Sequence, residues 1–177
     1  RVFSLISSAS SSLIVASILR LSGPLALSSF RRDRLLRRLQ ALNASVADVS
    51  ARFVHFVAVE GDLAADDRQR LEGLLRYGDP APEAQQGLEL LVVPRLGTVS
   101  PWASKATDIA RNCGLAQVRR IERAVAYTLV PKRGLLGGAK SLSADDLAAL
   151  AGALHDRMTE TVVDGAFDGA PLFATLA

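Results

Sequence analysis

The sequence predicts an α+β fold in which the order strand, helix, strand, helix occurs twice. The chain has 177 residues, of which 49% are hydrophobic and 22% charged, enough to bury one core. Its second half repeats the order of the first at an offset of roughly 75 residues, with Gly23 and Gly97 each preceding a helix. We therefore expect duplicated units that form a mostly antiparallel sheet with helices on one face. A parallel, doubly wound sheet is the alternative.

The first half alternates between period 2 and period 3.6. Residues 14–21 are predicted to form a strand, and a helix is expected over 28–42. In residues 51–59, Phe53, His55 and Val57 share one side while Val54 and Phe56 share the other, so this segment predicts a sheet strand. A helix over 65–76 follows, with Gly78 beyond its end.

The second half repeats this order. A strand is expected over 88–93, a helix from near Ser104 to Gly114, and a strand over 118–130. A glycine-rich connector over 132–140 leads to a last helix, which Ser143 and Asp146 are predicted to open as a variant capping box. The apolar face predicted for the helix at 104–114 consists of Ala106, Ile109, Ala110 and Cys113; that of the last helix consists of Leu147, Leu150, Leu154, Met158 and Val162.

The loop between residues 94 and 108 is the most specific polar segment of the chain. Hydroxyl groups and one lysine stand beside a predicted helix start, where the helix dipole favours an anion. Packing or capping is the competing interpretation, with Ser104 as the expected cap. Trp102 is expected either to stack on a ligand or to pack against a neighbouring domain. The candidate interface or substrate-adjacent residues are Arg95, Ser100, Trp102, Ser104, Lys105, Thr107, Asp108 and Asn112.

Several functional classes find little support. The net charge of +3 is too small to indicate nucleic acid, and the arginines of residues 31–38 are expected on a solvated helix face. There is no phosphate-binding G-x-x-x-x-G-K-[ST] loop. His55 and His155 lack partners at metal-ligand spacing, and the single cysteine, Cys113, is expected to be a buried thiol. We expect no catalytic residue and no metal site in this chain, and a cytoplasmic location.

Residues 1–17 are rich in serine and contain no acidic residue. A transit peptide, a secretory signal and a non-native extension are the alternatives, and the last is preferred. We expect this leader to be disordered, the domain to span 18–163, and residues 164–177 to begin a linker.

Six segments resemble the N-terminal region of the large, single-chain phosphoribosylformylglycinamidine synthases. The longest is the run over residues 94–115, in which Ala103 stands where serine is common in the family. In the run over residues 118–127, Ala124 stands where glycine is common. The segments are G-P-L-A-L-S-S-F-R, F-V-H-F, L-L-R-Y-G, P-R-L-G-T-V-S-P-W-A-S-K-A-T-D-I-A-R-N-C-G-L, V-R-R-I-E-R-A-V-A-Y and L-H-D-R-M-T-E-T-V.

The resemblance implies a non-catalytic N-terminal domain, similar to a dimer of the small accessory subunit of the split enzymes. Enzymes of this family convert formylglycinamide ribonucleotide to formylglycinamidine ribonucleotide with ATP and glutamine, in purine biosynthesis. The resemblance places ATP, magnesium and the glutaminase residues in other domains, which are the expected partners, and implies that this chain alone is inactive. The alternative is a free-standing module that binds an anionic ligand through residues 100–108.

Overall fold

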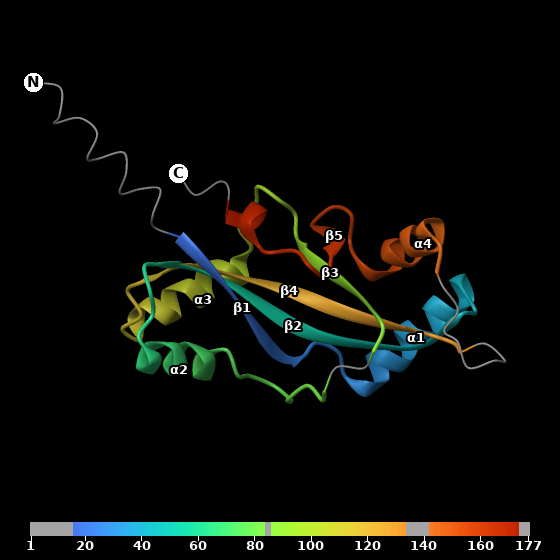
Figure 1. Ribbon diagram of the computed structural model, residues 1–177, viewed down its shortest axis with the longest axis horizontal. Coiled ribbons are helices and arrows are strands. Elements are labelled where there is room, and N and C mark those ends of the chain that lie inside the picture. The colour runs from blue at the N-terminus through green and yellow to red at the C-terminus, as the bar shows by residue number, and fades with distance from the viewer. Residues whose placement is uncertain (1–15, 84–85, 134–141, 174–177) are drawn as a thin grey trace, which may run out of the picture.

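The computed structural model describes residues 16–83, 86–133 and 142–173 and shows a five-stranded antiparallel sheet with four α-helices (Figure 1). Residues 1–15 of the expected leader and most of the expected glycine-rich connector lie outside the described residues. The elements in chain order are β1 (Ala16–Leu25), α1 (Ser29–Leu42), β2 (Val46–Glu60), α2 (Ala65–Leu74), β3 (Leu88–Pro94), α3 (Pro101–Asn112), β4 (Val118–Pro131), α4 (Ala144–Leu154), β5 (Glu160–Asp164) and the 3₁₀ helix η1 (Ala170–Phe173).

Neighbouring strands in the order β1-β2-β4-β3-β5 all pair antiparallel, which confirms the antiparallel prediction and excludes the parallel alternative. The long strands β2 and β4 pair at the centre, with Val54 opposite Ala124. β1 and β3 flank this pair, so exchanging the two halves leaves the order of the first four strands unchanged. This is the arrangement expected of a duplicated strand-helix-strand-helix unit.

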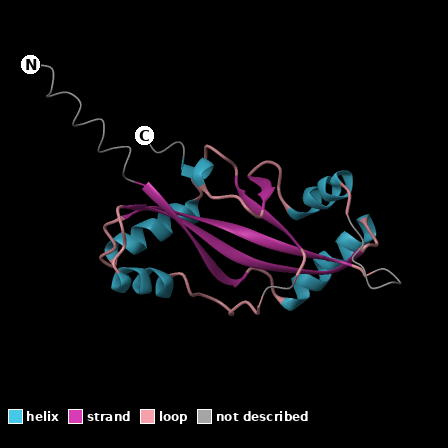
Figure 2. Ribbon diagram, viewed as in Figure 1, coloured by secondary structure: helices cyan, strands magenta, loops and turns pink. Residues whose placement is uncertain are grey.

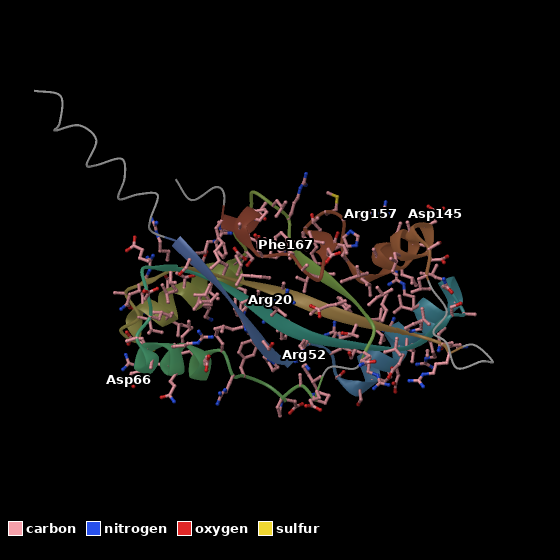
Figure 3. The ribbon with its side chains drawn as sticks, in the orientation of Figure 1. Arg20, Arg52, Asp66, Asp145, Arg157 and Phe167 are labelled. Atoms are coloured by element: carbon pink, nitrogen blue, oxygen red, sulfur yellow. The ribbon has the colours of Figure 1, made fainter. Side chains whose placement is uncertain are left out.

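Alternation along the strands separates two faces of the sheet. Val57 and Ile121 pack with Leu71 of α2 and Ala110 of α3 at one end. Figure 2 shows these helices at that end and α1 and α4 at the other, and Asp66 on α2 and Asp145 on α4 mark the two ends in Figure 3. All four α-helices therefore cover the same face. The second helix-side cluster consists of Leu39, Val46, Val49, Ala51, Val92, Tyr127, Leu129, Leu150 and Leu154.

The opposite face is covered by the segment that follows β5. Phe56 packs against Phe167 with ring centroids 5.7 Å apart, and Leu172 and Phe173 are buried in the same cluster. Arg20 on β1 donates to the carbonyl oxygen of Gly165 at 2.5 Å, which holds the start of the segment (Figure 3). Residues 164–173, expected to begin a linker, thus contribute to the core.

The last helix is shorter than predicted. Ser143 and Asp146 form the expected capping box, and Leu150 and Leu154 are buried as expected. The helix ends at Leu154, however, and the predicted stripe is wrong beyond that residue. Met158 is 76% exposed. Val162 lies in the strand β5, although its spacing from Leu154 and Met158 is that of a helix. β5 forms because β3 offers it an unpaired edge, with Val162 opposite Val92.

Helix α3 begins earlier than predicted and buries a different face. Its buried residues are Ala103, Thr107 and Ala110, whereas Ile109 is 46% exposed. Cys113 is also exposed, which corrects the prediction of a buried thiol. The reason is that β3 pairs with Val125 to Leu129 of β4, and α3 lies along the same edge of β4 nearer Val118. The Thr107 hydroxyl donates to the Ala103 carbonyl at 2.7 Å and accepts from the Ile121 amide at 3.0 Å, so the edge is satisfied by α3.

Helix α1 follows its prediction closely. Ser28 caps it by accepting from the Arg31 amide, and Leu39 is fully buried. Leu42 is 54% exposed because the helix ends there. Its arginines at 31, 34, 37 and 38 are exposed, as a solvated face requires.

Candidate functional site

The predicted site residues are divided between the interior and the surface of one end of the domain. Thr107 is 7% exposed, and Ser100 and Trp102 are partly buried. The remaining candidates are exposed along the loop before α3 and on the outer side of that helix; they are Arg95, Ser104, Lys105, Asp108 and Asn112. The candidate residues therefore lie partly in the interior and partly on the exposed surface, and they do not form one site.

The start of α3 is already satisfied by its own loop. Ser100, not Ser104, is the cap, and its hydroxyl accepts from the Ala103 amide at 3.1 Å. Pro101 occupies the first turn and has no amide to offer. Arg95 lies ahead of the helix, where its carbonyl accepts from the Thr98 hydroxyl at 2.6 Å. Ser100 and Pro101 thus occupy the helix start at which the anion site was predicted.

Trp102 instead joins a cluster of aromatic and basic side chains over the centre of the sheet. Its ring stacks on the buried His55 ring with centroids 5.7 Å apart. The Arg123 guanidinium lies between two rings, 4.2 Å from the centroid of Phe53 and 4.5 Å from that of Trp102. Stacking of this kind stabilises a partly desolvated cation. Tyr77, from the loop after α2, closes the cluster.

A hydrogen-bonded chain links the polar atoms of this cluster. Arg123 donates to the Tyr77 hydroxyl at 3.3 Å, and this hydroxyl lies 2.8 Å from His55 Nε2. Burial and, secondarily, the charge of Arg123 lower the pKa of His55 from 6.5 to about 4. Burial also raises the pKa of Tyr77. His55 is therefore neutral at pH 7, which leaves Arg123 as the cation of the cluster.

Two cavities meet at Trp102 and Arg123. The larger has a volume of about 370 Å³ and lies between α2 and α3, with Lys105 and Tyr77 in its wall. The smaller, about 260 Å³, is bounded by Phe53, Ser100 and the strands β3, β4 and β5. The remaining lining of the larger cavity is apolar and consists of Leu74, Leu75, Ala106, Ile109, Ala110 and Ile121.

Sequence reasoning missed Arg123, Tyr77 and Phe53 as site residues. A signal for Arg123 was present, because it occupies the same side of β4 as Ile121 and Val125, where alternation calls for an apolar residue. A charged side chain at such a position faces the helices and needs a special environment. Tyr77 carries no such signal, since it lies in a loop.

The described residues offer little other chemistry. Within residues 16–83, 86–133 and 142–173, no group of three or more histidine, cysteine or acidic side chains could hold a metal ion. In the same part of the chain, no helix combines the length and the apolar character needed to span a bilayer.

The titration of His55 gives a testable pH dependence. Because its pKa is lower in the folded protein than in the unfolded chain, the unfolded chain binds the proton first as the pH falls. The contribution of neutral His55 to the free energy of unfolding is complete above pH 6.5. It is lost as the pH approaches 4, which lowers the free energy of unfolding by about 3 kcal/mol. Urea unfolding between pH 7 and pH 4 should therefore show a steeper loss for the parent chain than for His55→Gln.

The matched substitution is His155→Gln, at the other histidine, which is partly buried and lies far from the cluster at the end of α4. It should retain the steep loss. Equal slopes for the parent chain and His55→Gln would show that His55 is not held neutral by burial.

The comparison with known families covers five of the six sequence segments, all but the one at residues 23–31. A sequence profile described as formylglycinamide ribonucleotide amidotransferase N-terminal matches residues 52–173, which is more than half of the chain. The match spans β2 to η1 and includes His55, Trp102 and Arg123. The resemblance to the N-terminal region of the phosphoribosylformylglycinamidine synthases is thereby confirmed. The chain belongs to the formylglycinamide ribonucleotide amidotransferase N-terminal family.

Proposed function

We propose that this chain is a non-catalytic domain that docks on the synthetase domain of a phosphoribosylformylglycinamidine synthase and supports its assembly and ammonia delivery. The family match supports a place in that enzyme. In this proposal, ATP, magnesium and glutamine are handled by other domains of a longer, cytoplasmic chain. In this proposal the whole enzyme acts as a ligase in purine biosynthesis. This domain supplies a docking surface rather than reacting groups.

The observation that carries the proposal is an exposed apolar patch beside Arg95. Leu96, Val99 and Met158 are 43%, 55% and 76% exposed. The Arg95 amide donates to the Thr159 carbonyl at 2.9 Å, which joins the two loops that bear these side chains. Apolar side chains gathered on neighbouring loops, with an arginine beside them, are typical of a protein interface.

The experiment is complementation between two polypeptides. The full-length enzyme lacking this region is assayed for ATP- and glutamine-dependent product, with and without this chain added. We expect the chain alone to make no product and the mixture to recover activity. Turnover by the chain alone would contradict the non-catalytic assignment, and a mixture without recovery would contradict docking.

A charge in the apolar patch tests its role. Val99→Asp should weaken complementation at least about tenfold, because an unpaired carboxylate would be buried on docking. Leu42→Asp is the matched control, since Leu42 is 54% exposed at the far end of the domain. Equal activity of the two variants would show that the partner does not use this patch.

A further inference from the structure

Arg123 is a partly buried cation with no counter-charge in the described part of the chain. Ion pairs there involve six basic residues, and Arg123 is not among them. Its guanidinium is stacked between Phe53 and Trp102 and donates to a neutral hydroxyl. A planar guanidinium held by two rings keeps its remaining N–H groups in a fixed plane, which suits a carboxylate.

Lys105 provides a second cation at the same cavity. It lies on α3 one turn after Trp102, and its side chain lines the space of about 370 Å³ together with Arg123 and the Tyr77 ring. No ion pair of Lys105 is found within residues 16–83, 86–133 and 142–173 either. Two cations and one hydroxyl therefore line a cavity whose other lining, the Trp102 ring included, is mostly apolar.

We propose that this cavity binds a small-molecule carboxylate with an apolar body. Small-ligand pockets are mostly apolar, have volumes of roughly 300–1,000 Å³ and contain a few converging polar groups. Arg123 and Lys105 bind the carboxylate, and the aliphatic wall, with Ile109 and Leu74 at its exposed side, takes the apolar body. A phosphate dianion is disfavoured, because its greater charge costs more to desolvate against such a wall. The proposal does not depend on docking to other domains.

The protein contains its own probe of the cavity. Trp102 is the single tryptophan of the 177 residues, and it lines the cavity. Its fluorescence, excited at about 295 nm, therefore reports on this site alone, since tyrosine absorbs little there. The ligand to titrate is 4-phenylbutanoate, which does not absorb at that wavelength. The comparison compounds are 4-phenylbutanamide, which lacks the charge, and inorganic phosphate, which lacks the apolar body.

We expect a saturable change of fluorescence with 4-phenylbutanoate and binding about tenfold weaker or more for the amide and for phosphate. Binding of the amide as tightly as the acid would show an apolar cavity without an anion site and would overturn the proposal. Tighter binding of phosphate would replace the ligand class by a phosphate. No saturable change with any of the three would also overturn the proposal.

Two substitutions locate the anion. Lys105→Met keeps the length of an exposed side chain and removes its charge, so it should weaken binding of 4-phenylbutanoate about tenfold without altering the circular dichroism spectrum. Lys132→Met is the matched control, an exposed lysine beyond the far end of β4, and should change binding less than about twofold. Equal effects of the two would indicate attraction by net charge and contradict the site. Arg123→Lys, which keeps the charge but loses the planar fork, should also weaken binding.

Discussion

Replacement of Arg120 by methionine is expected to lower the free energy of unfolding by about 3–5 kcal/mol. Arg120 is 5% exposed and Glu122 is fully buried, on the face of β4 that lies opposite the helices. Arg120 Nε donates to Glu122 Oε1 at 2.9 Å, and its guanidinium also donates to the Thr98 carbonyl at 2.9 Å. Without Arg120, the Glu122 carboxyl group remains in the core with no cation beside it, and the Thr98 carbonyl loses its donor.

The pH dependence of this loss identifies its cause. Burial raises the pKa of Glu122, and the hydrogen bond and charge of Arg120 oppose that rise. In Arg120→Met both effects of Arg120 are lost and the hydrogen bond with Ser100 still lowers the pKa, so the pKa rises further than in the parent chain. The folded variant then holds a proton that the unfolded chain releases above about pH 4.5, and its stability falls as the pH rises. The difference between the parent chain and the variant should shrink as the pH is lowered from 7 towards 4.5.

Urea unfolding of three variants completes the test. Arg119→Met removes an exposed arginine next in the chain and should change stability by less than about 0.5 kcal/mol. Arg120→Met combined with Glu122→Leu should recover much of the loss, since no buried charge is left. A double variant as unstable as Arg120→Met would mean that lost packing on Phe173, 5.5 Å from the guanidinium, dominates.

Replacement of Phe56 by alanine is expected to cost about 3–5 kcal/mol, because it leaves a cavity in the centre of the sheet. Phe56 is fully buried on β2 and contacts Phe167 in the covering segment. Gly169 approaches the ring so closely that a Cβ there would lie 2.5 Å from it, and its φ of +85° favours glycine. The phenyl ring is therefore the surface on which residues 165–173 are seated.

The same substitution should loosen that segment before the whole domain unfolds. Amide exchange at Leu172, whose amide donates to the Gly169 carbonyl at 3.0 Å, should accelerate more than exchange at the centre of β4. Phe30→Ala is the matched control, because Phe30 is 69% exposed on α1 and should cost less than about 0.5 kcal/mol. A loss at Phe56 as small as at Phe30 would contradict the seating of the segment.

Much of the architecture could be predicted because its signals are local. The alternation of Phe53 to Val57 identified β2, and Ser28 and Ser143 marked two helix starts that the structure confirms. The capping box and the glycine at 114, with its φ of +87°, depend on a few neighbouring residues. Short polar motifs also identified the family, since the profile match includes the segment from residue 94 to 115.

The candidate site was predictable only in part. Trp102 and Lys105 were identified from the loop motif, and both line the larger cavity. Arg123, which joins the two cavities, was not identified, because its environment is created by Phe53 from another strand and Trp102 from another helix. The helical spacing of Met158 and Val162 likewise resembled a continued helix, although Val162 pairs with β3.

The α+β class, the order of the elements through α4 and the family can all be predicted from the amino-acid sequence. Each depends on periodicity or motifs within a few residues, which act before distant segments meet. Three features emerge only when the chain is folded: the buried face of α3, the strand β5 and the aromatic cluster around Arg123. These features depend on unpaired strand edges and on side chains brought together from distant segments, as where Thr107 satisfies the Ile121 amide.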